Sequence, residues 1–127
     1  MEKEKLLMDI YGGINMQRYL DIINHFGLKN QLKKLNEETY ELIEAINEYE
    51  NLLFENEVYN NPYSEKELNI YRDCLVDELS DVLLLLTQVV AKYAISKYEV
   101  DEHMDIKLER TEKRIKSGYY ERDDNNE

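Results

Sequence analysis

The stretch Asp77-Glu78-Leu79-Ser80-Asp81-Val82-Leu83-Leu84-Leu85-Leu86 decides the fold of this chain. Its last five residues are apolar on every side of a helix, which is typical of a helix buried over most of its surface. One face of that helix carries, at steps of three and four, Leu75, Glu78, Val82, Leu85 and Val89. Two carboxylates, Glu78 and Asp81, therefore enter an otherwise apolar pattern, where a charge needs a partner.

A second acidic couplet, Glu38 and Glu41, lies in another predicted helix and borders its apolar stripe in the same way. Residues three apart share a helix face, so each couplet presents two carboxylates in one direction. Two such helices packed together bring four carboxylates into one cluster, which repels itself unless a hard divalent cation accepts the oxygens as ligands. The pattern predicts a metal site, although 28 acidic residues in 127 also produce such couplets on solvated surfaces.

Length and charge limit the class of protein. A chain of 127 residues predicts one domain, over 1–120, followed by a polar, acidic and disordered tail at 121–127. Long helices in so short a chain need a second subunit to cover their apolar faces, so we expect a homo-oligomer. The net charge of -12 argues against a nucleic-acid polymer as partner.

Cysteine use and hydropathy indicate the location of the chain. Cys74 is the only cysteine, so no intramolecular disulfide can form, which fits a cytoplasmic protein. No signal-peptide pattern opens the chain, and the longest apolar run, Val82 to Leu86, is far below the ~20 residues that span a bilayer. We therefore expect no membrane partner.

The residues that start and stop helices in this chain predict an all-α fold. The expected architecture is a four- to five-helix bundle that oligomerises through its long helices. The expected helices cover about residues 15–27, 28–54, 64–98 and 101–116. Asn15 is the expected cap of the first, Asn60-Asn61-Pro62 is a turn signal, and Ser64 with Glu67 is a capping box. In the last helix we expect Met104, Leu108 and Ile115 to face the core, and Gly118 to form a left-handed cap.

The segments Lys34-Leu35-Asn36-Glu37-Glu38-Thr39-Tyr40-Glu41-Leu42 and Asp77-Glu78-Leu79-Ser80-Asp81-Val82-Leu83 carry a resemblance to a known family. They resemble the acidic motifs of the all-α nucleoside triphosphate pyrophosphohydrolases, the MazG-like and dimeric dUTPase superfamily. The resemblance implies a helical dimer or tetramer that uses Mg²⁺, with Mn²⁺ as a substitute, to split a nucleoside triphosphate into a nucleoside monophosphate and pyrophosphate. Such a house-cleaning or dUTPase-like enzyme is a hydrolase of phosphoric anhydrides.

By position, the resemblance implies that the metal ligands are Glu38, Glu41, Glu78 and Asp81. Glu37 and Glu41 are then the candidate catalytic carboxylates, and the division of the general-base role between them stays open. The last helix adds candidate phosphate-binding residues on one face, Lys107, Arg110 and Arg114, and Lys34 is a further candidate one turn before Glu38. For the nucleobase the family pattern points by region to Gln17, Asn24 and Tyr119.

Alternatives accompany these assignments. The basic residues of the last helix also fit a solvated face that balances Glu109 and Glu112. The bundle also fits a non-catalytic interaction or regulatory module. A di-iron carboxylate site is weaker, because neither histidine follows a glutamate at the Glu-x-x-His spacing. The interval between Glu41 and Glu78 is longer than in compact MazG-like domains, and it leaves the preferred nucleobase open.

Overall fold

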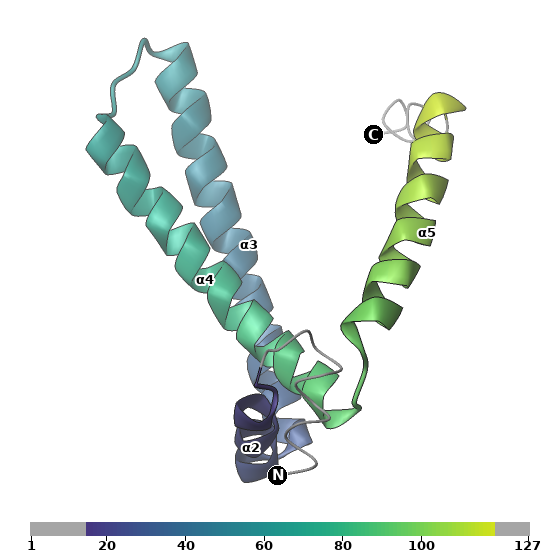
Figure 1. Ribbon diagram of the computed structural model, residues 1–127. Coiled ribbons are helices and arrows are strands. Elements are labelled where there is room, and N and C mark those ends of the chain that lie inside the picture. The colour runs from purple at the N-terminus through teal and green to yellow at the C-terminus, as the bar shows by residue number, and fades with distance from the viewer. Residues whose placement is uncertain (1–14, 119–127) are drawn as a thin grey trace. The chain divides into compact units, whose positions relative to one another are not determined.

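The computed structural model describes residues 15–118, and this part of the chain forms four helices and no strand (Figure 1). The helices are α2 (Gln17–Phe26), α3 (Leu28–Val58), α4 (Glu65–Lys92) and α5 (Lys97–Lys116). The chain divides into two compact units, of which one is Met16–Tyr93 with α2, α3 and α4, and the other contains α5. The predicted all-α class is therefore confirmed.

The two long helices, α3 and α4, form an antiparallel hairpin (Figure 1). The predicted turn lies between them, where Asn60 and Asn61 have the left-handed φ values of 60° and 58° that asparagine tolerates better than most residues. The turn is held to the end of α3, because the Oδ1 atom of Asn56 accepts from the Tyr63 N–H at 3.0 Å and the Tyr63 hydroxyl donates to Glu55. The hairpin sets the register in which α3 and α4 face each other.

The structure corrects four helix boundaries. The prediction that the third helix runs towards residue 98 was wrong, because α4 ends at Lys92 and Ala94 takes a left-handed φ of 49°. The predicted start of the last helix near residue 101 was also wrong, because a capping box starts α5 at Ser96. The Ser96 side chain accepts from the Glu99 N–H, and the Glu99 carboxylate accepts from the Ser96 N–H. The other two corrections are that α3 continues four residues beyond the predicted end, to Val58, and that Met16 rather than Asn15 is the N-cap of α2.

The core of the Met16–Tyr93 unit is small. Helix α2 packs against both long helices near the start of α3 and the end of α4 (Figure 1). The buried apolar residues are Met16, Leu20, Ile23, Ala45, Val82, Leu85 and Ala91. Two glutamines are buried with them, and the Nε2 atom of Gln31 donates to the Oε1 atom of Gln88 at 2.8 Å. This bond ties α3 to α4 beside α2.

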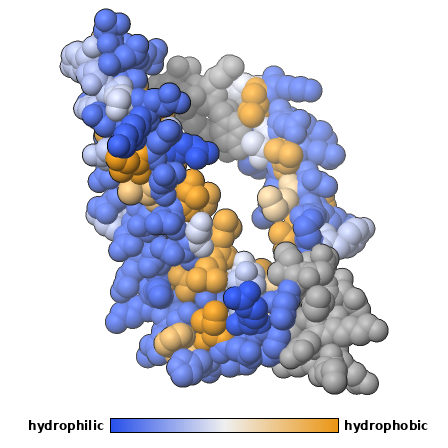
Figure 2. All heavy atoms as spheres, turned by 60° about the vertical axis from the view of Figure 1, so that its left-hand side comes forward, coloured by the Kyte–Doolittle hydropathy of each residue, from blue (hydrophilic) through white to orange (hydrophobic). Residues whose placement is uncertain are grey.

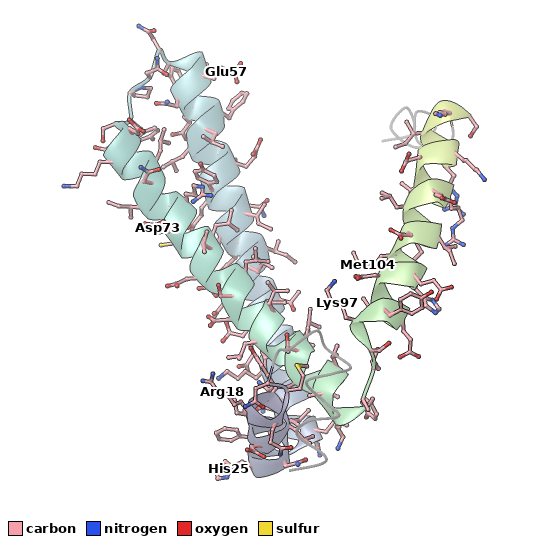
Figure 3. All side chains as sticks on the ribbon, viewed as in Figure 1. Arg18, His25, Glu57, Asp73, Lys97 and Met104 are labelled. Atoms are coloured by element: carbon pink, nitrogen blue, oxygen red, sulfur yellow. The ribbon has the colours of Figure 1, made fainter. Side chains whose placement is uncertain are left out.

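Helix α5 carries Lys97 at its first position and Met104 in its middle (Figure 3). It contains no buried residue, so the prediction that Met104, Leu108 and Ile115 face a core was wrong for this structure. The cap at its end was predicted correctly, since Gly118 has a φ of 77° and donates to the carbonyl of Ile115 at 3.1 Å.

In residues 15–118, no helix is long and apolar enough to cross a membrane. The predicted domain end at 120 and the tail at 121–127 lie outside the described residues. The cytoplasmic location stays a prediction.

Candidate metal centre

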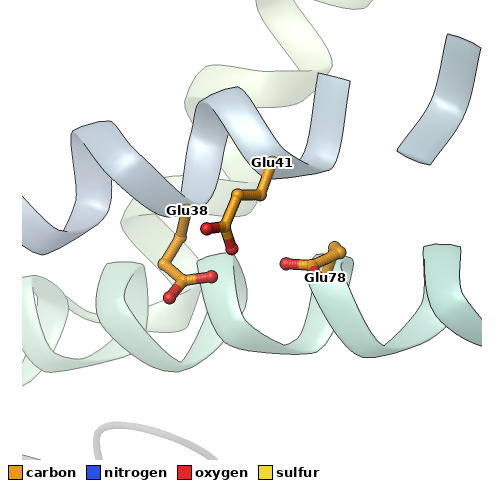
Figure 4. Close-up of side chains that lie close together, drawn as sticks. All are labelled: Glu38, Glu41 and Glu78. Carbon is orange, nitrogen blue, oxygen red and sulfur yellow. The ribbon is translucent and has the colours of Figure 1, made fainter. Parts of the chain in front are cut away.

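Three carboxylates from two helices converge in the Met16–Tyr93 unit (Figure 4). Glu38 and Glu41 project from α3, and Glu78 projects from α4 towards them. One oxygen of each carboxylate lies within 4.8 Å of the others. The couplet spacing explains the pair on α3, because residues three apart share a helix face, and the hairpin register brings Glu78 opposite them.

The protein supplies few hydrogen-bond donors to the carboxylates of this cluster. Glu38 and Glu78 each have an Oε2 atom that is buried and has no hydrogen-bond partner within the described residues. Burial raises the pKa of both carboxyls above 4.5, and the negative charges of Glu41 and Asp81 raise these pKa values further. The fold therefore holds two carboxylates where the ionised form is disfavoured.

Buried carboxylate oxygens without donors are what a bound cation would satisfy. Mg²⁺ and Mn²⁺ prefer oxygen ligands, and one cation between these helices would accept an oxygen from each of the three glutamates and would cancel their repulsion. The donor set contains no sulfur or imidazole, so it suits a hard cation better than zinc. The residues present thus fit a divalent metal.

Two further predicted acids lie at the edge of the cluster. Asp81 is exposed and stands outside the group of three, although its charge raises the pKa values of Glu38 and Glu78. Glu37 is exposed and lines a separate surface hollow together with Glu41. Both carboxylates therefore flank the cluster and remain accessible to water.

A cavity of about 270 Å³ opens beside the cluster. Its walls come from all three helices of the unit, and they include Ile22, Phe26, Gln31, Lys34, Glu38, Asp81, Leu84, Leu85 and Gln88. The mixture of apolar side chains with one ammonium group and two amides is typical of a small-molecule site. Acidic groups at one end of the cavity and the amide pair at the other give it two chemically different ends.

The comparison with protein families agrees with this geometry. The family model of the MazG nucleotide pyrophosphohydrolase domain matches residues 26–125, which is most of the chain. The chain belongs to this family. It is therefore a nucleotide pyrophosphohydrolase, a hydrolase that acts on the phosphoric anhydride bonds of nucleotides, and the resemblance inferred from the acidic motifs is confirmed. Neither the curated proteins nor the solved structures gave a match.

The MazG domain places the predicted basic residues in two groups. Lys34 lines the cavity with Glu38 and Asp81. The other three belong to α5, in the second unit, and all are exposed: Lys107, Arg110 and Arg114. Lys107 also borders a shallow hollow on α5 with Met104 and Leu108.

Two of the residues predicted for the nucleobase, Gln17 and Asn24, are not part of the cavity wall. The Nε2 atom of Gln17 donates to the Oδ1 atom of Asp21 at 2.7 Å, and Asn24 is exposed on α2. Tyr119 lies outside the described residues. The residues of α2 that reach the cavity are Ile22 and, at the end of the helix, Phe26.

Sequence reasoning missed Gln31 and Gln88, the amide pair of the MazG domain. A usable signal existed, because Gln31 precedes Glu38 by seven residues and Gln88 follows Asp81 by seven. A step of seven returns to the same helix face, so both glutamines belong to the acidic faces of α3 and α4. Polar residues at such positions are candidates for a site.

Proposed function

We propose that this MazG domain uses Mg²⁺, with Mn²⁺ as a substitute, to hydrolyse a nucleoside or deoxynucleoside triphosphate to the monophosphate and pyrophosphate. The observation that carries the proposal is the convergence of Glu38, Glu41 and Glu78, with two buried carboxylate oxygens that lack donors. A protein gains nothing from this repulsion unless a cation is bound there.

Glu38, Glu41 and Glu78 are the proposed metal ligands that approach one another most closely. We assign Asp81 to the same ligand set, since its charge acts on Glu38 and Glu78 and its side chain borders the cavity. A ligand contributed through a bound water is compatible with that position, because Mg²⁺ usually keeps several of its waters. When bound, the metal neutralises charge on the phosphate oxygens and lowers the pKa of a water molecule.

The chain's own carboxylates handle the proton of the attacking water. The water oxygen forms a bond to the α-phosphorus, the bond from that phosphorus to the bridging oxygen breaks, and pyrophosphate leaves with its electron pair. A carboxylate in hydrogen-bond reach accepts the proton of the water. Glu41 and Glu37 are the proposed candidates, because both line the same open hollow at the edge of the cluster.

We propose that the cavity beside the cluster is the binding site of the nucleoside. Its volume of about 270 Å³ is sufficient for a base, and the Phe26 ring and the two amides offer stacking and hydrogen bonds. Lys34 is the proposed phosphate ligand within this unit. On α5 the proposed phosphate-binding residues are Lys107, Arg110 and Arg114, on the strength of their shared helix face.

Gln17, Asn24 and Tyr119 stay weaker proposals for contact with the base. The substrates we propose are house-cleaning or dUTPase-like targets, with the preferred base to be measured. We also propose that the enzyme works as a homo-oligomer, a dimer or a tetramer.

A panel of ribonucleoside and deoxynucleoside triphosphates, incubated with purified protein and Mg²⁺, tests the reaction. Phosphorus NMR should show a monophosphate and pyrophosphate in equal amounts and no orthophosphate. Release of orthophosphate, or no turnover of any substrate, would contradict the proposal and favour a non-catalytic module. Glu38→Gln should abolish turnover with the helical content preserved, while Glu50→Gln, an exposed change on the same helix, should leave turnover unchanged.

The roles of the two candidate bases can be separated with Glu37→Gln and Glu41→Gln. Loss of the general base lowers kcat by about 10²–10⁴-fold. If Glu41 is both ligand and base, its variant loses metal-induced stabilisation as well as turnover. If Glu37 is the base, Glu37→Gln loses turnover and retains metal binding.

A further inference from the structure

A buried pair of carboxamides lies at the end of the cavity away from the carboxylates. Gln31 on α3 is 7% exposed and Gln88 on α4 is 1% exposed, yet both side chains line the cavity of about 270 Å³. The Nε2 atom of Gln31 donates to the Oε1 atom of Gln88 at 2.8 Å. Hydrogen bonds from these amides to a ligand are therefore shielded from competition with bulk water.

The pair keeps hydrogen-bonding groups that the protein does not use. Each carboxamide carries a carbonyl acceptor and an amino donor group, and the bond between them occupies the carbonyl of one and a single hydrogen of the other. Within residues 15–118, the side chains of Gln31 and Gln88 make no other hydrogen bond. The carbonyl of Gln31 and the N–H groups of Gln88 thus remain for a molecule in the cavity.

The distance between the pair and the metal centre suits a nucleoside. Gln31 precedes Glu38 by seven residues on α3. Gln88 follows Asp81 by seven residues on α4. Because the two helices are antiparallel, both steps run in the same direction along the hairpin, and seven residues correspond to about 10 Å of helix. This is about the length of a nucleoside from its 5′ oxygen to the far edge of the base, so a nucleotide with its phosphates at the carboxylates brings its base to the amides.

Apolar side chains form the walls between the two ends of the cavity. Ile22 and Phe26 on α2 and Leu84 on α4 belong to these walls. Phe26 is 54% exposed and Leu84 is 43% exposed, and Figure 2 shows apolar groups that reach the surface of the helical unit between charged ones. The His25 ring packs edge-on against the Phe26 ring, with 4.7 Å between the ring centroids. The faces of a flat base stack against such walls, which leaves its polar edge for the amides.

The polar edge of a pyrimidine places a donor beside an acceptor. In uracil N3–H is the donor and O4 the acceptor, whereas in cytosine N3 is the acceptor and the amino group at position 4 is the donor. The amide pair presents the complement of the uracil edge. The free carbonyl of Gln31 accepts from N3–H while the free amino group of Gln88 donates to O4.

Reversal of both amides exchanges these two roles. The last torsion of a glutamine side chain is roughly two-fold, so the carboxamide fills the same space after its oxygen and nitrogen change places. When both side chains turn, Gln88 donates to the carbonyl of Gln31, and the free groups are an N–H of Gln31 and the carbonyl of Gln88. This second arrangement donates to N3 of cytosine and accepts from its amino group.

We propose that Gln31 and Gln88 bind the hydrogen-bonding edge of the nucleobase as a reversible pair, and that the enzyme therefore accepts both uracil and cytosine nucleotides. This proposal rests on the proposed hydrolysis of nucleoside triphosphates at the metal centre. A bidentate contact whose donor and acceptor are fixed discriminates between bases by about 5- to 150-fold. A pair that reverses as a unit loses this discrimination and keeps the hydrogen bonds.

Isothermal titration calorimetry of the full chain with Mg²⁺ tests the proposal. The ligands are the α,β-methylene analogues of UTP, CTP and N3-methyl-UTP, which resist hydrolysis, so binding is measured without turnover. The N3-methyl group blocks the donor of the uracil edge and leaves the sugar and phosphates unchanged. For the wild type we expect dissociation constants of the UTP and CTP analogues that agree within about fivefold, and a value at least about tenfold higher for the N3-methyl analogue.

Gln88→Met keeps the approximate shape of the side chain and removes its hydrogen-bonding groups. It should weaken binding of the UTP and CTP analogues by about tenfold and leave the N3-methyl analogue unchanged. A purely structural role of the pair would instead weaken all three by the same factor. If Gln88→Met loses helical content by circular dichroism, the double variant Gln31→Met, Gln88→Met takes its place. The matched control is Thr87→Val, because Thr87 is outside the cavity wall and should bind all three analogues as the wild type does.

Each outcome bears on one proposal or on both. A smaller wild-type difference between the UTP and N3-methyl analogues, or equal losses for all three analogues in Gln88→Met, would overturn the contact between the amides and the base. A preference larger than about fivefold between the UTP and CTP analogues would overturn the reversal of the pair. Edge-dependent binding without hydrolysis of UTP itself would contradict the proposed function alone, and no binding of any analogue would overturn both.

Discussion

Glu38 on α3 and Glu78 on α4 face each other across the hairpin, and each keeps one buried carboxylate oxygen without a donor. Glu41 lies beside this pair, and one oxygen of each of the three carboxylates lies within 4.8 Å of the other two. An unligated cluster of this kind opposes folding, because it combines desolvation with like-charge repulsion. A bound cation removes both costs, and this relationship leads to the first two predictions.

Mg²⁺ or Mn²⁺ should raise the melting temperature of the wild-type chain. At about 100 times the dissociation constant, a bound ligand stabilises the folded state by about 2.7 kcal/mol, which corresponds to about 10 °C for a domain of this size. Differential scanning fluorimetry with and without metal measures the shift. Glu38→Gln and Glu78→Gln should lose most of it, whereas Glu50→Gln should keep it. An equal shift in all four proteins would remove the metal assignment.

The stability of the metal-free protein should fall as pH rises. The folded-state pKa values of Glu38 and Glu78 lie above 4.5, because burial and neighbouring negative charges disfavour ionisation. Their contribution to the free energy of unfolding is fully present below 4.5, where both are protonated in the folded and unfolded states, and it is lost as pH rises through the raised pKa values. Urea unfolding in a chelator between about pH 4 and 8 measures this loss.

The double variant Glu38→Gln, Glu78→Gln is the reference for that experiment. It removes both titrations and leaves the remaining carboxyls of the chain, including Glu99, in place. The difference in unfolding free energy between wild type and variant should therefore change with pH. A difference that stays constant over the whole range would show that neither carboxyl titrates abnormally.

Lys34 should contribute to substrate binding, because its side chain borders the cavity beside Glu38. Hydrogen bonds from a charged donor are worth about 1.5–3 kcal/mol, so Lys34→Ala should lower kcat/KM by about 10- to 100-fold. The neighbouring Lys33 is exposed and not part of the cavity wall, which makes Lys33→Ala the matched control. Both variants should keep the metal-induced stabilisation. Equal kinetics of the two would exclude a phosphate contact at Lys34.

The periodic signals of the sequence predicted most of the fold. Apolar residues at steps of three and four predicted the helices, and Asn60 and Asn61 predicted the turn of the hairpin. The break after Lys92 was missed because the apolar pattern continues past it. The capping box at Ser96 and Glu99 was the local signal that should have decided the start of α5.

Helix periodicity and the turn signal also made part of the site predictable. Glu38, Glu41 and Glu78 converge because their spacing fixes a helix face and the hairpin fixes the register. Asp81 was predicted as an equal member of the ligand set, but its distance from the other three depends on side-chain conformation, which spacing does not determine. The cavity formed by α2, α3 and α4 depends on packing, so sequence reasoning did not identify Gln88 as part of it.

The hydrogen bond between Gln31 and Gln88 leads to the last prediction. Gln88→Met removes the acceptor of a buried 2.8 Å bond and leaves the Gln31 amide without its partner. An unpaired buried donor costs about 1–3 kcal/mol, while two apolar side chains of similar shape can replace the pair at little cost. The double variant Gln31→Met, Gln88→Met should therefore lose less unfolding free energy than the sum of the two single variants. Urea unfolding of the four proteins measures this coupling, and strictly additive losses would show that the two amides do not stabilise each other.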